Sequence, residues 1–256
     1  MIKLQDVTFA YPQQPPVFEH FNWRGERGDV WAVLGPSGCG KSTLLMLLAG
    51  LAQPQSGVIC IDRDPITRPR PRTGLILQDY GLLPWATVRE NVALGLNIRR
   101  FYGPDDRHVP RNTRVDKAEA AANVTYWLAR LGIEAIADKY PVHISGGQRQ
   151  RAAIARTLVL DPDLLLMDEP FSALDAPTRE GLQTLTLALC AEAGLIVVLV
   201  THAIEEAAFI GQKVLLLSDL PNRDTTVLDN PHVADNAYRH ETAYQSMCAL
   251  LREHLG

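Results

Sequence analysis

The sequence predicts an α/β fold in which a mainly parallel β-sheet is covered by helices on both faces. Short apolar runs, as expected for buried strands, alternate along the chain with stretches of helical periodicity. A glycine-rich turn at residues 35–40 joins one of these strands to a helix that is apolar nearly all round. With 256 residues, 46% of them apolar, the chain can form one large core or a core with an inserted subdomain.

The first part of the chain is expected to contain strands on either side of a buried helix. Residues 2–9 alternate loosely between polar and apolar side chains, and residues 29–34 form a short apolar run that ends at a glycine. The apolar residues 42–52 then predict a buried helix. Further strands are expected at 58–61 and 73–77, followed by a helix at 88–99.

A polar segment interrupts this pattern in the middle of the chain. Residues 101–114 contain two prolines, a glycine and many charged or histidine side chains, which indicates a loop or an insertion. An alanine-rich helix is expected next, at 115–131, and Gly132 is suited to end it. The later elements are expected to be helices at 148–159, 203–210 and 238–255, strands at 164–167, 195–200 and 213–217, and a turn-rich segment at 219–231.

Composition and charge disfavour several classes of protein. A net charge of −4 argues against a dedicated nucleic-acid binder, which is usually basic. The four cysteines are widely spaced without a CxxC pair, so we expect reduced thiols and neither a zinc site nor a redox motif. The N-terminus lacks the apolar core of a signal peptide, and the longest apolar runs fall far short of the ~18 residues of a membrane-spanning helix. We therefore expect a soluble chain that reaches a membrane only through a partner.

Residues 35–42 read GPSGCGKS and match the phosphate-loop pattern G-x-x-x-x-G-K-[ST], with the required strand before it and helix after it. Glycines allow a tight turn whose N–H groups point at phosphate oxygens, and the helix N-terminus adds the positive end of its dipole. Lys41 is expected between the β- and γ-phosphates, and the Ser42 hydroxyl is expected to bind Mg²⁺. The candidate nucleotide-binding residues of this loop are Gly35, Pro36, Ser37, Gly38, Cys39, Gly40, Lys41, Ser42 and Thr43.

Two carboxylates follow a buried strand in the string LLLMDEP at residues 164–170. The carboxyl ends of strands are where ligands bind in open α/β sheets. Asp168 is placed to hold Mg²⁺, directly or through water, and Glu169 is the candidate to polarise an attacking water. A solvated acidic turn is the alternative interpretation, but a magnesium–nucleotide site beside a phosphate loop requires such a carboxylate.

Residues 144–151 read ISGGQRQR and precede LLLMDEP, with a helix between them. The string resembles LSGGQ, the signature of the ATP-binding-cassette ATPases, with Ile144 conservatively replacing the usual leucine. Ser145, Gly146, Gly147 and Gln148 open a helix and would form a second anion-binding terminus. A plain helix cap would explain the serine but not the whole string.

Other positions match the family one at a time. The resemblance implies that Tyr11 stacks on adenine, although a tyrosine that packs near a strand end is the alternative. Gln78 in LILQD matches the Q-loop glutamine, which touches Mg²⁺ or water, and the string SALD at 172–175 matches the D-loop, which contacts the opposite subunit. His202 matches the switch histidine, which contacts the γ-phosphate. Ala203 stands where the family usually has aspartate, so we expect retained hydrolysis with one local hydrogen bond missing.

The resemblance covers residues 1 to about 218 and implies a P-loop NTPase (RecA-like) core with an N-terminal antiparallel β-subdomain and an inserted α-helical subdomain. We expect the core at 1–86 and 156–218, the helical subdomain at 87–155, and a C-terminal tail with an amphipathic helix at 219–256. ATP and Mg²⁺ are the implied cofactors, and Lys41, Gln78, Glu169 and His202 the implied catalytic residues. Two such domains would meet head to tail, either as a homodimer or with a second ATPase subunit, with each ATP between one phosphate loop and the partner's residues 145–148.

The resemblance also implies partners. In the family, the region after Gln78 receives a short helix from the membrane subunit, and here it contains the apolar cluster Leu82, Leu83, Pro84 and Trp85. Packing into the chain's own core is the alternative for these side chains. The string LLPWATVRENVALGL is similar to importers of nitrate, sulfonate, taurine and related small organic anions, or of thiamine-precursor pyrimidines. We therefore expect a peripheral protein at the cytoplasmic face of the inner membrane, bound to permease subunits and served indirectly by a periplasmic or extracellular solute-binding protein.

The main alternative is a soluble cassette ATPase that acts in DNA repair, translation or cluster assembly. Repair members carry a long coiled-coil insertion and translation members carry two cassettes, and the sequence shows neither. A GTPase switch would need an N-K-x-D string, which is absent. A degenerate cassette that binds nucleotide without hydrolysis is disfavoured because Lys41, Asp168, Glu169 and His202 are all present.

Overall fold

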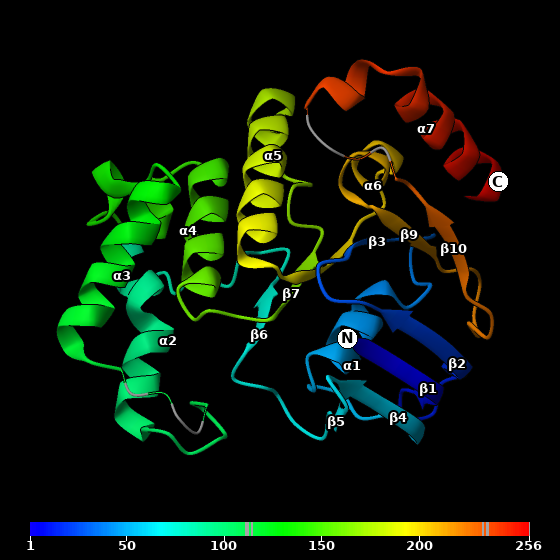
Figure 1. Ribbon diagram of the computed structural model, residues 1–256, viewed down its shortest axis with the longest axis horizontal. Coiled ribbons are helices and arrows are strands. Elements are labelled where there is room, and N and C mark those ends of the chain that lie inside the picture. The colour runs from blue at the N-terminus through cyan, green and yellow to red at the C-terminus, as the bar shows by residue number, and fades with distance from the viewer. Residues whose placement is uncertain (111–112, 114, 232, 234–235, 256) are drawn as a thin grey trace. The chain divides into compact units, whose positions relative to one another are not determined.

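The computed structural model describes residues 1–110, 113, 115–231, 233 and 236–255, and the chain divides into two compact units. The first unit comprises Met1–Pro69, Leu166–Glu169 and Gln183–Gly256, and the second comprises Arg70–Leu165 and Pro170–Leu182. Figure 1 shows the elements of both units along the chain. Among the described residues, no helix has the length and apolar character needed to cross a membrane.

An antiparallel sheet of four strands forms the N-terminal part of the first unit. Its strands, in the order β2-β1-β4-β5, are Pro16–Gly25, Ile2–Ala10, Ser56–Ile61 and Asp64–Pro65. This confirms the expected antiparallel subdomain, but β2 and β5 were not predicted individually. In β2, Val17 and Phe18 are both buried, and the register with β1 shifts three times, so the alternation that identifies a strand is broken.

A mainly parallel sheet forms the core of the first unit, as predicted. Strand β3 (Val30–Leu34) pairs in parallel with β8 (Ile196–Val200) on one side and with β9 (Lys213–Leu216) on the other. Strand β10 (Thr226–Asp229) adds to β9 in antiparallel orientation, and β7 (Leu164–Asp168) lies beyond β8. The segment at 219–231, expected to be turn-rich, also contains β10, which was not predicted. β10 is a largely exposed edge strand, so its sequence lacks the apolar signal of a buried one.

Helices α1 (Lys41–Leu48), α6 (Ile204–Ile210) and α7 (Thr242–Leu255) belong to the first unit. The last helix packs against α6 and the sheet through the buried side chains of Met247, Cys248 and Leu251. The single helix expected at 238–255 is in fact a 3₁₀ turn at Asn236–His240 followed by α7. The buried Tyr238 explains the break, because it belongs to the 3₁₀ turn and its hydroxyl donates to Asn230 Oδ1 at 2.6 Å.

The second unit is mostly helical. It contains β6 (Thr73–Ile76), α2 (Val88–Tyr102), α3 (Lys117–Arg130), α4 (Gly146–Leu158) and the 3₁₀ turns Glu134–Ile136 and Pro141–His143. Helix α2 runs three residues past the expected end at Arg99 and stops at Gly103, whose φ of 68° suits glycine. Helix α5 (Ala176–Ala193), which passes from the second unit into the first, was not predicted. Its Thr-Leu-Thr-Leu stretch has the period of a strand as much as that of a helix.

A buried asparagine joins three segments beneath the phosphate loop. Asn222 is 1% exposed, and its amide nitrogen donates to the carbonyls of Cys39 at 2.7 Å and Val17 at 3.2 Å. Its side-chain oxygen accepts from the Ser218 N–H at 3.0 Å. Asn222 therefore ties β2 and the segment after β9 to the loop that was predicted to bind phosphate.

Replacing Asn222 by alanine should lower the free energy of unfolding by about 1–3 kcal/mol, because the Cys39 and Val17 carbonyls would lose a buried donor. Chemical denaturation followed by circular dichroism measures this change. Asn97→Ala, on the exposed side of α2, is the matched control and should shift stability by less than ~0.5 kcal/mol. Equal effects of the two substitutions on stability would contradict the role of Asn222 in tying β2 and the segment after β9 to the phosphate loop.

Candidate functional site

The phosphate loop lies at the carboxyl end of β3 and leads directly into α1. Gly38 and Gly40 have φ values of 81° and 104°, in the left-handed region that favours glycine. A Cβ atom on Gly40 would also lie 2.5 Å from the Val17 Cγ1 atom, so a side chain there would collide with β2. The sequence pattern that predicted the loop is thus required by its backbone.

The Lys41 side chain folds back over the loop. Its ammonium group donates to the carbonyl oxygens of Gly35 and Pro36, both at 2.8 Å, and lies 3.9 Å from the Cys39 Sγ atom. Burial raises the pKa of the Cys39 thiol, with Lys41 opposing the shift, so the thiol is neutral at physiological pH. Lys41 therefore carries a positive charge into a loop whose glycines leave the backbone accessible.

The acidic pair reaches the same edge of the sheet. The Glu169 N–H donates to the Val200 carbonyl at 2.9 Å, and the Thr201 N–H donates to the Val33 carbonyl at 3.1 Å, so the carboxyl ends of β7, β8 and β3 are adjacent. Asp168, the last residue of β7, is hydrogen-bonded to the Ser42 side chain. Burial is the main cause that raises the pKa of Asp168, and the neighbouring Glu169 adds to it, while Ser42 and Lys41 oppose it.

Glu169 and His202 face each other across this edge. The Nδ1 atom of His202 lies 2.9 Å from Oε1 of Glu169, and Glu169 has a positive φ of 44°, which a non-glycine residue seldom adopts. Such strained backbones are concentrated at functional sites. His202 is the more exposed of the two, with 63% of its side chain accessible against 20% for Glu169, so both can reach a ligand from the solvent side.

A cavity of about 610 Å³ brings most of these residues together. Tyr11 stands at its rim, 41% exposed, with its hydroxyl 3.1 Å from the Thr43 Oγ1 atom and its ring edge-on to Phe9. One face of a tyrosine at this position is available for an aromatic ligand. The cavity is lined by Tyr11, Gln14, Val17, Ser37, Gly38, Gly40, Lys41, Ser42, Thr43, Glu169, His202 and Leu220.

The residues present fit a magnesium ion that is shared with phosphate. Ser42 and Asp168 are in hydrogen-bond contact, so a hydroxyl and a carboxylate converge at one place beside Lys41. Mg²⁺ prefers few protein oxygens and completes its shell with phosphate oxygens and water. Ser42 and Asp168 are therefore suited to supply the protein oxygens of such a shared site.

The predicted signature segment belongs to the second unit. Ser145 caps α4 in a reciprocal capping box: its hydroxyl accepts from the Gln148 N–H at 3.3 Å, and its own N–H donates to the Gln148 side chain at 3.0 Å. A Cβ atom on Gly147 would lie 2.6 Å from the Thr178 Cγ2 atom, so a side chain there would force the Thr178 side chain on α5 to move. Gly146 and Gly147 leave the first turn of α4 without side chains that would block its N–H groups.

Two residues that the sequence analysis missed hold the segment after Gln78, which is itself exposed in the second unit. Asn91 is completely buried, accepts from the Leu83 N–H at 2.7 Å and donates to three carbonyls between residues 83 and 87. Arg156, on α4, donates to the carbonyls of Tyr80 and Gly81 at 2.9 and 2.5 Å. The sequence offered one signal for Asn91, namely a polar residue on the side of the α2 helix that is buried. It offered no signal for Arg156.

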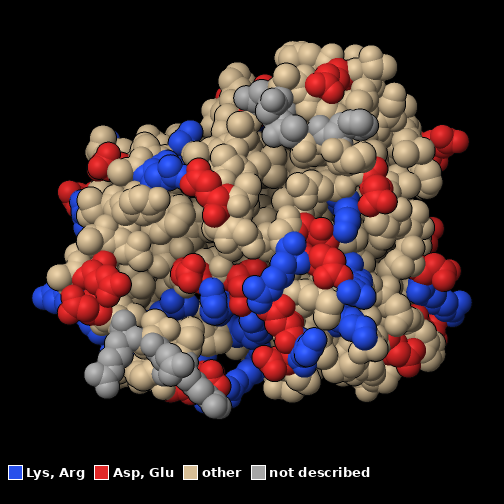
Figure 2. Space-filling model, in the orientation of Figure 1, with Lys and Arg blue, Asp and Glu red and all other residues tan. Residues whose placement is uncertain are grey.

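The apolar cluster at 82–85 is exposed to solvent at Pro84 and Trp85 rather than buried in the chain's own core. Trp85 is 74% exposed and Pro84 is exposed, while Leu82 and Leu83 are half-buried. Figure 2 shows that Lys and Arg side chains are interspersed with Asp and Glu on the face in view.

Three curated relatives of this chain are ATP-binding proteins of import systems. The nitrate import ATP-binding protein NrtC of Synechococcus elongatus is 44% identical over 194 residues, which are 76% of this chain but only 28% of NrtC. The aliphatic sulfonates import ATP-binding protein SsuB of Bacillus cereus is 39% identical over 90% of this chain and 86% of its own length. The taurine import ATP-binding protein TauB of Escherichia coli O157:H7 is 43% identical over 81% of this chain and 76% of its own.

Solved structures agree in fold. The dimeric cassette MJ0796, in a post-hydrolysis state bound to ADP and Pi, matches with a TM-score of 0.75 and 30% identity, covering 90% of this chain and 99% of its own. The CbiO1 component of a Clostridium perfringens ABC transporter complex matches with the same TM-score and 28% identity, covering 90% and 88%. The family model for ABC transporters matches residues 18–172, more than half of the sequence. The chain thus belongs to the ABC transporter family.

Proposed function

We propose that this chain is the ATP-hydrolysing subunit of an importer that moves a small solute of the nitrate, sulfonate or taurine kind through a separate permease. The observation that carries the proposal is the shared cavity, in which the phosphate loop, Glu169 and His202 line one space large enough for a nucleotide. The names of NrtC, SsuB and TauB support the class of solute. The alternative of a cassette ATPase without transport has no relative among these three.

The geometry supports a role for each residue in hydrolysis. The N–H groups of the loop and the Lys41 ammonium would bind the β- and γ-phosphates, and Tyr11 would stack on adenine. Glu169 carries the carboxylate that would accept a proton from the attacking water, and His202 would orient that carboxylate and contact the γ-phosphate. Ser42 and Asp168 would hold Mg²⁺ together with the phosphates, and the ion would supply positive charge against the charge that develops on the phosphate oxygens.

The proposed active state is a head-to-tail pair of cassettes. The sequence contains one SGGQ string, at residues 145–148, and a second anion-binding helix terminus is needed if ATP is to be enclosed from both sides. The dimeric MJ0796 structure with ADP and Pi supports such a pair. ATP would favour the closed dimer because its γ-phosphate contacts both subunits, and hydrolysis would remove that advantage. By its resemblance to the Q-loop glutamine, Gln78 would touch Mg²⁺ or water and report the nucleotide to the permease.

The permease would dock on the apolar cluster at 82–85. Trp85 and Pro84 are exposed, and Asn91 and Arg156 fix the backbone that presents them. A rigid loop with an exposed aromatic side chain is a favourable anchor for a partner helix. In this proposal the chain would lie at the cytoplasmic face of the membrane as a peripheral subunit, and a solute-binding protein would act on the other side of the permease.

Glu169→Gln should abolish steady-state ATP hydrolysis while ATP binding persists, because the amide keeps the shape of the carboxylate and loses its basicity. Turnover should fall by at least about 10²-fold, as expected for the loss of a general base. Phosphate release measures turnover, and size-exclusion chromatography with MgATP should show a trapped dimer. Glu180→Gln, on α5, is the control; turnover near wild type in Glu169→Gln would exclude Glu169 as the base.

Dilution should lower ATP turnover per chain, because one chain supplies only half of each proposed site. We expect turnover per molecule to rise with protein concentration and to level off once dimers dominate. Phosphate release at a series of concentrations, with light scattering on the same samples, measures this. Constant turnover per chain across a range in which only monomers are detected would contradict the composite site.

Trp85→Ala should reduce the amount of permease that co-purifies with the chain from membranes, by roughly tenfold or more if Trp85 is a central anchor. Phe101→Ala, which removes an equally exposed aromatic ring from the end of α2, is the matched control and should leave co-purification unchanged. Quantitative immunoblotting of the purified complexes measures both. Loss of permease with the control, or retention with Trp85→Ala, would assign the docking surface elsewhere.

A further inference from the structure

The helix that follows His202 lacks the usual side-chain cap. Helix α6 starts at Ile204, and its N-cap residue Ala203 has no side chain that could accept from the first turn. A Ser, Thr, Asn or Asp at this position contributes about 1 kcal/mol to helix stability. A helix of seven residues also has little stability of its own, so its position is set by what packs against it.

The position of α6 matters for His202 because the two are joined directly. The Ala203 N–H donates to the Thr201 Oγ1 atom at 3.0 Å, and the Ala203 carbonyl accepts from the Ala207 N–H at 3.0 Å. On the other side, the Thr201 N–H is fixed to β3 through the Val33 carbonyl. His202 therefore lies between a fixed strand end and a helix whose first turn must be held from outside.

The C-terminal segment supplies this support at two points. The Tyr244 hydroxyl of α7 donates to the main-chain carbonyl of Glu205, in the first turn of α6, at 3.2 Å. Burial raises the pKa of Tyr244 well above its usual range, so the hydroxyl remains a donor at every physiological pH. The ring itself packs in the apolar cluster between α6 and α7.

Arg239, just before α7, holds the other side of α6. Its guanidinium donates to the Gln183 side-chain oxygen at 2.5 Å, and the Gln183 amide donates to Glu206 Oε1 at 2.9 Å. Gln183 and Glu206 are 1% and 5% exposed, so this chain of hydrogen bonds is buried. The guanidinium also lies 3.4 Å from the centre of the Phe209 ring, in a cation–π contact.

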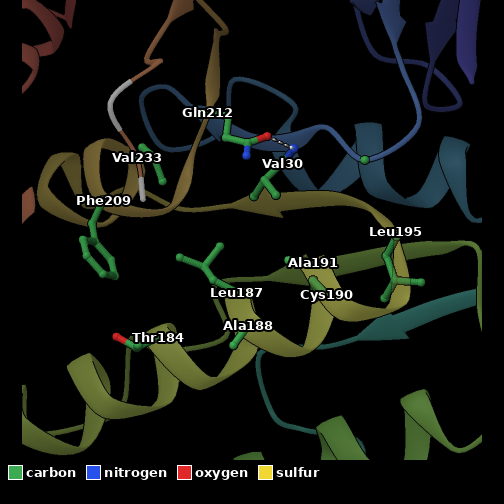
Figure 3. A pocket seen from close by; sticks show the side chains of 12 residues that line it. Val30, Thr184, Leu187, Ala188, Cys190, Ala191, Leu195, Phe209, Gln212 and Val233 are labelled. Carbon is green, nitrogen blue, oxygen red and sulfur yellow. Dashed lines mark hydrogen bonds between the residues drawn. The ribbon is translucent and has the colours of Figure 1, made fainter. Parts of the chain in front are cut away.

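A cavity borders one side of α6. It has a volume of about 530 Å³ and lies between the second half of α5 and the Phe209 side of α6 (Figure 3). Phe209, Leu187 and Val233 point toward this space from three different segments. At Phe209, α6 therefore faces a cavity on this side rather than close-packed side chains, and the contact with Arg239 is made at the same ring.

We propose that Arg239 and Tyr244 are positioning residues for His202: they fix α6 from the C-terminal segment and thereby hold the imidazole against Glu169. The proposal rests on the roles in hydrolysis that are proposed above for His202 and Glu169. The ion pair of Arg252 with Glu205 is not part of it, because both side chains are more than half exposed and such pairs contribute little.

The test compares Tyr244→Phe and Arg239→Met in the full chain, at a protein concentration at which wild-type turnover per molecule is constant. We expect kcat for ATP hydrolysis to fall by about tenfold, because a misplaced catalytic group loses rate steeply. The dissociation constant for MgATP, measured with a fluorescent analogue, should change by less than about twofold. Tyr126→Phe, an exposed tyrosine on α3, and Arg252→Gln are the controls and should keep wild-type kcat.

A rescue experiment separates positioning from general destabilisation. Ala203→Asp supplies α6 with the missing N-cap, and in the Tyr244→Phe background it should restore most of the lost kcat. In the wild-type background the same substitution should change kcat by less than about twofold, because the C-terminal segment already holds the helix. The melting temperature of each variant is measured, and kcat is taken well below it.

Unchanged kcat in both Tyr244→Phe and Arg239→Met would overturn the proposal. A loss of kcat in Tyr244→Phe that Ala203→Asp does not restore would also overturn it. His202→Ala is measured alongside as the reference for complete loss of the histidine. If the wild-type chain hydrolyses no ATP, the proposed function itself fails. If His202→Ala retains wild-type turnover, the role proposed for His202 fails, and the positioning role fails with it. If the wild-type chain and His202→Ala behave as expected while Tyr244→Phe and Arg239→Met keep wild-type kcat, only the positioning role fails.

Discussion

The shape of the phosphate loop around the Lys41 ammonium is the constraint on which the rest of the site depends. The loop can turn tightly only because Gly38 and Gly40 adopt left-handed backbone conformations. The carbonyl oxygens of Gly35 and Pro36 both accept hydrogen bonds from the Lys41 ammonium. Asn222 then fastens the loop to β2 and to the segment after β9. These contacts arrange the N–H groups before any ligand arrives, so binding requires little reorganisation.

The parallel sheet gives this loop its partners. Because the carboxyl ends of β3, β7 and β8 are adjacent, three short turns bring Lys41, Asp168, Glu169 and His202 to one edge. The signature segment is carried by a different compact unit, where Ser145 and Gln148 cap each other and two glycines open the helix terminus. This division of the chain accords with the proposal that a second cassette completes each nucleotide site, and it leaves the C-terminal segment free to act on α6 from within the first unit.

The sequence predicted the motifs better than the supports that hold them. The phosphate loop and the acidic pair were identified because their chemistry demands fixed residue types at short spacing. In the structure the loop and Glu169 line one cavity, and Asp168 is hydrogen-bonded to Ser42 of the loop. Strands β2 and β10 and helix α5 were missed because bulges, edge exposure and a mixed period obscure the apolar pattern. Asn222 and Arg156 could not be assigned from single positions, since each donates to carbonyls that are distant in sequence. Asn91 was marked only as a polar residue on the buried side of a helix, and it donates to nearby carbonyls that no motif identifies.

The most direct measurement of the central claim is complementation between two inactive variants of the full chain. Lys41→Ala removes the ammonium from the phosphate loop, and Ser145→Arg blocks the signature helix, so each variant alone should be inactive. In an equal mixture, half of the dimers would contain one intact site made from both chains, and turnover should recover to about a quarter of wild type if sites act independently. A mixture as inactive as its components, with mixed dimers shown to form, would contradict the account.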